Sequence, residues 1–377
     1  MKILFLAYNF GTNSPGGISS LRIADALSEL GHDVTVICSQ HCLKDWEHGD
    51  VFYCSDFPSR PSNFFFRISN TFQRDLTHLS WKIRAKKVAK NVLSSLKPDF
   101  IYAKSEPPIV CQLGSELSKK FSIPILMHFT DPVPLPIEWN PNIKQRKRDI
   151  TLMKKILPQA TLISFGNEAM LNYQKSIMDY DYETFISPDP SPKLLINNIE
   201  HKEKKIKTII YFGAFYGNRN PMNLFTAIDS LNNEGFNCKL LVYDINRLHL
   251  KESAFVKFLG RTNNAKEVLS NADCFIDLDA EDKYPVFISS KLKDYLLYTT
   301  PIVSITPENS PTRNLLQNLR TVFIAHNTIE EIKLVIKQAF STPLSFDDYK
   351  ERKTIQNIFA PKKIAQVITN KMISKIK

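Results

Sequence analysis

Long hydrophobic runs are absent from this chain of 377 residues. No stretch of about 18 uncharged apolar residues occurs, which argues against a membrane-spanning helix. The apolar start, MKILFLAYNF, is too short for a signal peptide and is followed directly by GTNSPGG, without a small-residue cleavage site. We therefore expect a cytoplasmic protein.

The sequence also lacks closely spaced cysteine motifs. Six cysteines are present, but none forms a C-x-x-C pair, and no cysteine–histidine cluster has the spacing of a zinc site. This pattern predicts buried, reduced thiols. Zinc-finger and aromatic RNA-binding signatures are missing as well, and nucleic acid is therefore the least favoured of the anionic partners.

The composition is that of a globular protein, with 43% apolar and 23% charged residues. Because a domain averages about 150 residues, the length predicts two domains. The net charge is +11, from 49 Lys and Arg against 38 Asp and Glu. This excess favours an anionic partner such as an acidic membrane face or a phosphorylated small molecule.

Strand-like and helix-like segments alternate along the first half. Residues 2–8 form an apolar run bounded by turn residues, residues 18–30 have a helical period closed by Gly31, and residues 33–38 form the next strand. Further strands are expected at residues 99–103, 124–128 and 160–164, and helices at 81–96, 110–121 and 150–157. This alternation predicts a doubly wound parallel sheet with helices on both faces.

A second set of units follows a Pro- and Lys-rich stretch. We predict strands at residues 208–212, 239–243, 254–259, 274–278 and 301–305, and helices at 221–232, 266–270, 290–298 and 329–339. The expected domains are residues 1–190 and 208–356, joined by a linker at 191–207. A C-terminal helix within residues 357–377, with Ile364, Val367, Ile368 and Met372 on one side, packs back toward the first domain. Two such α/β domains in tandem predict a cleft between the carboxyl ends of their sheets.

Three segments in the first domain carry candidate residues. Gly16 and Gly17 follow the first strand, where a glycine loop lets a ligand approach backbone amides; the alternative is a tight turn. His128 and Asp131 (HFTDP) follow another strand, where they would bind sugar hydroxyls; the alternative is an Asp-Pro turn. Glu106 (SEPP) has the same topological position, with a solvated or capping carboxylate as its alternative.

Two segments in the second domain carry cationic candidates. Arg219 lies in GAFYGNRN after the first strand, and a guanidinium binds diphosphates in bidentate fashion. Ser289, Ser290 and Lys291 stand at a predicted helix start as a phosphate cradle, with Asp294 one turn further on to bind ribose hydroxyls. The alternatives are a surface Arg and a capped helix with a surface Lys–Asp pair.

These segments together resemble the family-4 glycosyltransferases of the GT-B fold, over essentially the whole chain. The resemblance rests on KILFLAYNF…GG, ALSELGHDVTVI, TIIYFG and SKLKDYLLYTTPIV. SEPP and HFTDP are similar to sequences of the bacterial surface-polysaccharide branch. In the family pattern the diphosphate-binding Lys falls on Arg219, while the Arg place falls on Ala214 or Phe215. The second of two glutamates falls on Asp294, and the first on Val286.

The resemblance implies a retaining glycosyltransferase that moves a sugar from a nucleotide diphosphate-sugar to a lipid-linked saccharide in polysaccharide, O-antigen or capsule biosynthesis. Arg219 and Lys291 would neutralise the diphosphate, His128 would contact the donor sugar, and Gly16 and Gly17 would admit the diphosphate. No cofactor is implied. We expect no metal ion, since Asp277 and Asp279 are interpreted as strand-end residues facing solvent or a cap.

Two further expectations follow. The segment of residues 64–90, which begins at Phe64 and ends at Lys90, combines aromatic and basic residues that suit an anionic membrane surface; a solvated helix face over a buried Phe cluster is the alternative. A catalytically degenerate scaffold in a polysaccharide-assembly complex is the alternative to an enzyme, because Val286 and the missing Arg depart from the family pattern. A sugar-nucleotide epimerase is a weaker rival, because its catalytic groups have no counterpart here.

Overall fold

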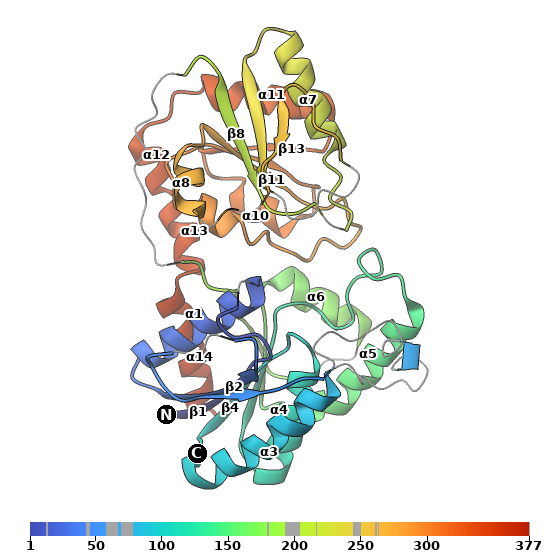
Figure 1. Ribbon diagram of the computed structural model, residues 1–377, viewed down its shortest axis with the longest axis vertical. Helices are drawn as coiled ribbons and strands as arrows, with labels where there is room; N and C mark the ends of the chain where they lie inside the picture. Colours follow the sequence, from blue (N-terminus) through green and yellow to red (C-terminus); the bar gives the residue numbers. More distant parts are fainter. Residues whose placement is uncertain are drawn as a thin grey trace. The chain divides into compact units, whose positions relative to one another are not determined.

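The computed structural model describes residues 1–12, 14–42, 46–57, 67–68, 78–178, 181–192, 204–215, 217–243, 250–260, 262 and 264–376. Two compact units make up the chain, Met1–Pro192 with Ile358–Lys377 and Lys193–Asn357. Each has a parallel sheet flanked by helices (Figure 1). Phe64, residues 69–77, most of the expected linker and Lys377 lie outside the described residues.

The first unit is built on a seven-stranded sheet in the order β3-β2-β1-β4-β5-β6-β7. Its strands are β1 (Lys2–Leu6), β2 (Asp33–Ser39), β3 (Val51–Cys54), β4 (Phe100–Lys104), β5 (Ile125–Phe129), β6 (Leu162–Phe165) and β7 (Thr184–Ile186). Every neighbouring pair is parallel. Because helices cover both faces, the central strands are buried along almost their whole length and appear in the sequence as continuous apolar runs.

The helices of this unit cover opposite faces of its sheet. They are α1 (Pro15–Glu29), α3 (Leu79–Leu96), α4 (Ile109–Phe121), α5 (Ile143–Ile156), the 3-10 turn η1 (Leu157–Gln159), α6 (Glu168–Ile177) and α14 (Pro361–Ile373). Phe5 and Tyr102 share a core cluster with residues of α1 and α14. Gly114 of α4 instead packs over Leu6 and Ala103 on the other face. The doubly wound arrangement predicted from the sequence is confirmed.

The C-terminal helix α14 packs against α1, as predicted. Its buried residues are Ile364, Ala365, Ile368 and Met372. Val367, which we expected on the same side, is 44% exposed. At 100° per residue the buried arc is centred between Ile368 and Met372, and Val367 falls outside it.

The second unit has a six-stranded sheet in the order β10-β9-β8-β11-β12-β13, again parallel throughout. Its strands are β8 (Lys207–Phe212), β9 (Cys238–Tyr243), β10 (Val256–Phe258), β11 (Cys274–Leu278), β12 (Ile302–Ile305) and β13 (Val322–Ala325). Its helices are α7 (Met222–Asn233), α8 (Ala265–Ser270), α9 (Leu292–Tyr295), α10 (Pro311–Leu316), α11 (Ile329–Ser341), α12 (Phe346–Lys350) and α13 (Arg352–Ile358). Ile209 and Ile210, adjacent in β8, belong to different core clusters, which shows that both faces of this sheet are also buried.

Short elements account for most differences from the prediction. The helix expected at residues 290–298 is only one turn, α9, and the strands β3, β7 and β13 and the helices α6, α10, α12 and α13 were not expected. Such pieces have too few residues for a clear hydrophobic period, and tertiary contacts hold them instead. Arg352 is an example: its buried guanidinium donates to the carbonyl oxygens of Tyr298 and Thr300, at 2.7 and 2.9 Å.

Among the described residues, no helix combines the length and the apolar character that crossing a bilayer requires.

Candidate functional site

Each sheet has one topological switch point. In the first sheet the strand order reverses between β1 and β4, and in the second between β8 and β11. The segments that follow two such strands leave toward opposite faces, and ligands of open α/β sheets bind there, at the carboxyl ends of the strands. The residues after β1, β4, β8 and β11 are therefore the first candidates for a site.

Gly16 and Glu106 meet at the switch point of the first sheet. Gly16 and Gly17 lie in the first turn of α1, where Gly17 N donates to the N-cap Ser14 Oγ at 3.1 Å, and not in a loop before the helix as we expected. A Cβ at Gly16 would overlap the carboxyl group of Glu106, so only glycine lets this carboxylate approach the turn. The positive end of the helix dipole favours an anion at this place.

A buried lysine lies behind that pair. Lys104, the last residue of β4, is 1% exposed and donates to the carbonyl oxygen of Gly16 at 3.3 Å. Its Nζ lies 3.8 Å from Glu106 Oε2 and 3.8 Å from Asp189 Oδ1. Asp189 also accepts a hydrogen bond from Ser19 of α1. Partial burial raises the pKa of Glu106, with Asp189 adding to the rise and Lys104 opposing it.

His128 lies within β5 and is fully buried, although we expected it beyond the strand end and in contact with substrate. Its Nδ1 hydrogen-bonds Ser164 Oγ at 2.8 Å, and its Nε2 is buried with no hydrogen-bond partner. Burial lowers its pKa to about 3, and the charge of Lys104 adds to this effect. His128 is therefore a neutral imidazole beneath the site and presents no surface to solvent.

Asp131 follows β5 and is exposed to solvent. Neighbouring groups displace part of the water around its carboxyl group. This loss of hydration and the negative charges of Glu106 and Asp189 raise its pKa. The positive charge of Lys104 opposes this rise. The first unit therefore gathers Glu106, Asp131 and Asp189 at one edge of its sheet, with Lys104 as the cation among them.

In the second unit, Lys291 lies against the end of β8. Its Nζ stands 4.9 Å from the ring centroid of Tyr211, within the range of a cation–π contact. A Cβ at Gly213 would lie 2.6 Å from Lys291 Cδ, and Gly213 also has a φ of 145°, which disfavours other residues. Gly213 thus gives the lysine room at the switch point of the second sheet.

Arg219 lies in the segment between β8 and α7 and is 6% exposed. Its neighbours are held on both sides: Asn218 Nδ2 donates to Asp282 Oδ1 at 2.7 Å, and Asn327 Nδ2 donates to the carbonyl oxygen of Asn220 at 3.3 Å. The positive charge of Arg219 also acts on Asp279, which follows β11. Arg219 therefore lies within the segment between β8 and α7, and Lys291 packs against the start of that segment at Gly213.

Asp277 and Asp279 are buried, so the expectation that they face solvent is wrong, whereas Asp279 does contact a helix cap, Ser310 at the start of α10. Asp277 accepts a hydrogen bond from Ser304 Oγ at 3.4 Å, and Asp279 one from Ser310 Oγ at 2.6 Å. Burial raises the pKa of Asp279 to about 6, although the bond from Ser310 opposes the rise. The negative charge of Asp277 adds to this rise in the pKa of Asp279.

The remaining candidates surround the short helix α9. Ser289 is 3% exposed, Ser290 is exposed and Asp294 is half-buried. Since α9 has only four residues, it lacks the dipole on which the expected phosphate cradle depends. Val286 is 2% exposed and apolar, so it offers no group to a sugar hydroxyl.

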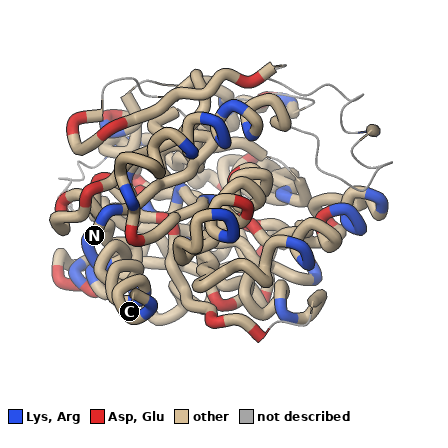
Figure 2. The backbone as a smooth tube through the Cα atoms, turned by 90° about the horizontal axis from the view of Figure 1, so that it is seen from below, with Lys and Arg blue, Asp and Glu red and all other residues tan. Residues whose placement is uncertain are grey.

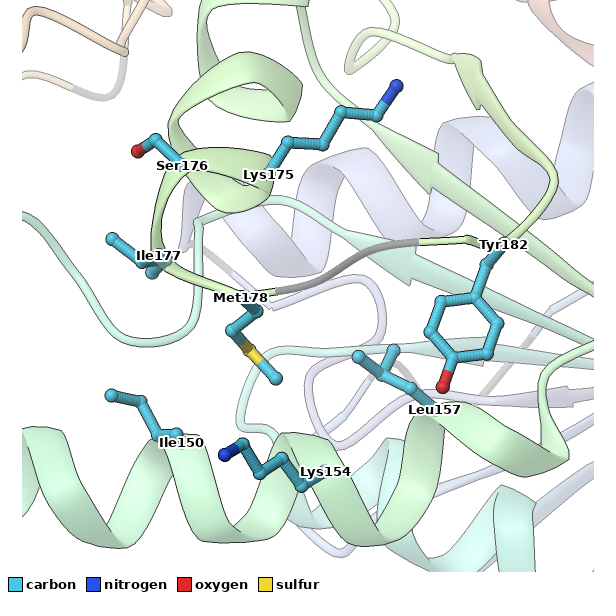
Figure 3. Close-up of a pocket in the computed structure, with 8 residues that line it drawn as sticks. All are labelled: Ile150, Lys154, Leu157, Lys175, Ser176, Ile177, Met178 and Tyr182. Atoms are coloured by element: carbon cyan, nitrogen blue, oxygen red, sulfur yellow. The ribbon is translucent and has the colours of Figure 1, made fainter.

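A cavity of about 530 Å³ lies elsewhere in the first unit, between the end of α5 and the end of α6. Ile150, Leu157 and Met178 face it, while Lys175 extends away from its centre (Figure 3). The segments that line it lead into β6 and β7, so the cavity lies at the amino edge of the sheet. It is therefore separate from the residues gathered at the carboxyl edge.

No protein-family model and no curated protein matches the sequence. Among solved structures, Anabaena Alr3699/HepE in complex with UDP-glucose has a TM-score of 0.66 at 15% identity, covering 99% of this chain and 100% of that chain. A glycosyltransferase from Rickettsia africae ESF-5 has a TM-score of 0.66 at 13% identity, covering 99% and 98%. The trehalose 6-phosphate synthase of Burkholderia multivorans has a TM-score of 0.64 at 11% identity, covering 99% and 98%.

At these identities the likeness establishes the fold, and the fold is GT-B. Its elements match those predicted from the sequence: two parallel Rossmann-like sheets and a C-terminal helix on α1.

Sequence reasoning missed Lys104, Asp189, Asp282 and Asn327. Lys104 directly follows a predicted strand, and Asp282 lies four residues beyond the end of another; these positions were the only signal available. Asp189 was placed at the end of the first domain, next to the predicted linker, and nothing local connects it to α1. Their roles arise from contacts between distant segments, which periodicity does not reveal.

Proposed function

We propose that this protein is a glycosyltransferase that uses a nucleotide diphosphate-sugar donor. The observation that carries the proposal is that two cations lie at the carboxyl end of β8: Lys291 packs against Gly213, and Arg219 is buried in the segment between β8 and α7. Ammonium and guanidinium groups at strand ends are well suited to a diphosphate. The GT-B fold supports the same assignment.

The proposal gives the residues of each unit a separate role. Arg219 and Lys291 of the second unit bind the diphosphate, and Asp294, with Ser289 and Ser290 nearby, binds the ribose side. Glu106 and Asp131 of the first unit accept hydrogen bonds from sugar hydroxyls. Since Glu106 already lies against Gly16, we assign this turn and Gly17 to the sugar and not to the diphosphate. His128 supports the sugar site from beneath.

The proposed reaction proceeds with retention at the anomeric carbon. The bond from this carbon to the diphosphate oxygen breaks, and a bond to the acceptor hydroxyl oxygen forms on the same face. The hydroxyl proton passes to the departing diphosphate. Arg219 and Lys291 stabilise the negative charge that develops on the leaving group, which is the main catalytic contribution available here.

The acceptor in this proposal is a lipid-linked saccharide of bacterial polysaccharide synthesis, and an anionic membrane surface is the partner. The first unit supports this with cationic helices: α3 has five Lys and Arg residues and no acidic one, and Arg84, Lys87 and Lys90 among them are exposed. Lys and Arg recur on several helices in Figure 2, where they are blue. Phe64, the aromatic end of the proposed surface, lies outside the described residues.

A second candidate function is a non-catalytic GT-B scaffold. Val286, where the resemblance places a glutamate, is buried and apolar, and Ala214 or Phe215 stands at the place of an arginine. A scaffold of this kind need not bind a nucleotide. Nucleotide binding therefore separates the two candidates.

The test begins with a thermal-shift screen of nucleotide-sugars and with calorimetric titration of UDP and GDP. Ligand binding to the native state raises the melting temperature. We expect UDP to bind, since the similar HepE has been solved in complexes with UDP and with UDP-glucose. Arg219→Ala and Lys291→Ala should each lower turnover about tenfold or more, equivalent to roughly 1.4 kcal/mol of transition-state stabilisation.

The matched control is Lys239→Ala, which removes an exposed cation from β9 of the same unit and should leave turnover unchanged. Normal turnover in Arg219→Ala or Lys291→Ala would remove that residue from the site. Absence of binding for every nucleotide tested, by a folded protein, would favour the scaffold.

A further inference from the structure

Lys104 is a buried cation to which the proposed function gives no part. It is 1% exposed, and its Nζ contacts the Gly16 carbonyl oxygen and lies 3.8 Å from both Glu106 and Asp189. A buried ammonium costs several kcal/mol unless negative groups compensate it. Its position indicates that the protein uses this charge to hold the carboxylates around it.

The groups that face Lys104 are mainly acidic. Glu106 comes from the end of β4, Asp131 from the end of β5 and Asp189 from the segment after β7. Among the other neighbours, His128 is neutral, Tyr102 is a buried phenol, and the first turn of α1 contributes no acidic side chain. Three carboxylates thus surround one ammonium, and its removal would leave them to repel one another.

We propose that Lys104 is a positioning residue that keeps Glu106 ionised and in place beside Gly16, as an acceptor of hydrogen bonds from the hydroxyl groups of a neutral sugar. The proposal deepens the proposed function and rests on it. With 1% exposure, Lys104 has almost no surface with which to touch a ligand, so it acts through Glu106.

The chemistry of the cluster selects the ligand class. Ionised carboxylates accept hydrogen bonds and repel phosphate, so the carboxyl edge of the first sheet suits a hydroxyl-rich, uncharged group. The raised pKa of Glu106 shows that ionisation there depends on its surroundings, and Lys104 is the group that favours the charged form. An opposite charge within about 4–6 Å lowers a carboxyl pKa by about one to three units.

The experiment measures kcat/KM against pH for the full-length Lys104→Met variant, with the donor found in the nucleotide-sugar screen. Without the ammonium, Glu106 takes up a proton at higher pH. We expect the acid limb of the profile to move up by about one pH unit or more, with activity recovering at alkaline pH. UDP affinity should stay within twofold, because the diphosphate contacts are assigned to the second unit.

The matched control is Lys82→Met. Lys82 is also a buried lysine, with its side chain 11% exposed and its Nζ 2.7 Å from Glu116 Oε1, but it lies on α3. This variant loses a buried ion pair outside the site and should keep the wild-type pH profile. Lys104→Arg, which keeps the charge, should also keep it, and Glu106→Gln should abolish the acid limb.

An even loss of activity at every pH in Lys104→Met, or an unchanged profile, would overturn the proposal and assign Lys104 a structural role. If Lys104→Met fails to fold, the Glu106→Gln profile decides: an acid limb that persists in that folded variant overturns the proposal equally. Infrared difference spectroscopy across a pH titration, with Glu106→Gln as the reference, measures the protonation of Glu106 without requiring turnover. A shift of that titration in a protein that binds no nucleotide would support Lys104 while rejecting the proposed function.

Discussion

Gly16 shows how one residue without a side chain shapes the site. A Cβ there would occupy the space of the Glu106 carboxyl group, and Gly213 has the same relation to Lys291 in the other unit. The sequence placed Gly16, Glu106 and Gly213 after strands and Lys291 at the start of a helix. Their pairing depends on segments far apart in the chain, so only the folded structure brings each glycine against its charged partner.

Gly16→Ala should displace Glu106 and weaken sugar binding. We expect kcat/KM to fall about tenfold or more while UDP affinity stays unchanged, because the clash is confined to the first unit. The measurement is steady-state kinetics together with calorimetric titration of UDP.

Gly166→Ala is the matched glycine control. A Cβ at Gly166 would meet only Met170 Cε at 3.7 Å, an ordinary contact, and kinetics should be those of the wild type. Full activity in Gly16→Ala would show that Glu106 has no defined place beside this turn.

Among the elements, α14 shows that the sequence predicts the existence of a long amphipathic helix well. It predicts less well which of the helix's residues are buried. The sequence indicated a C-terminal helix that packs toward the first domain, and α14 does pack against α1. The error concerned Val367, which lies on the exposed side. Short elements such as α9 carry too few residues for any periodic signal, so their bounds come from packing.

Ile368→Ala tests this packing. Ile368 is fully buried in the core shared by α1 and α14, and the substitution should lower the free energy of unfolding by about 2–5 kcal/mol. Val367→Ala, one residue earlier and exposed, should change it by less than about 0.5 kcal/mol. Both values follow from urea unfolding monitored by circular dichroism. Equal effects of the two substitutions would contradict the burial seen for α14.

On the scale of the whole molecule, the net charge of +11 is distributed unevenly over its helices. In the first unit, α5 has the sequence IKQRKRDITLMKKI, and α3 carries five basic residues without an acidic one. Not all of these are available to a membrane, because Lys82 and Lys86 pair with Glu116 at 2.7 and 2.5 Å. Arg84, Lys87 and Lys90 are exposed, beside Ile83 at 61% exposure.

Flotation with anionic phospholipid vesicles tests the proposed membrane surface. Reversing Arg84, Lys87 and Lys90 to Glu should reduce vesicle binding at least tenfold at physiological salt, since each basic residue near an anionic surface contributes about 1 kcal/mol. The control reverses three exposed lysines on α13 and α14, Lys353, Lys362 and Lys363, with the same change in net charge. An equal loss of vesicle binding in both triple variants would show that binding depends on net charge alone and would contradict a membrane surface on α3.

The sequence by itself determined the class of the fold and the strand ends at which charged residues stand. Apolar strands and amphipathic helices are local signals, because each can be recognised within a window of about ten to twenty residues. The tertiary structure alone decided which of those residues meet. It buried His128 within β5, placed Glu106 against Gly16, and set Lys104 among three carboxylates, because burial and electrostatic balance are properties of groups that folding gathers from distant parts of the chain.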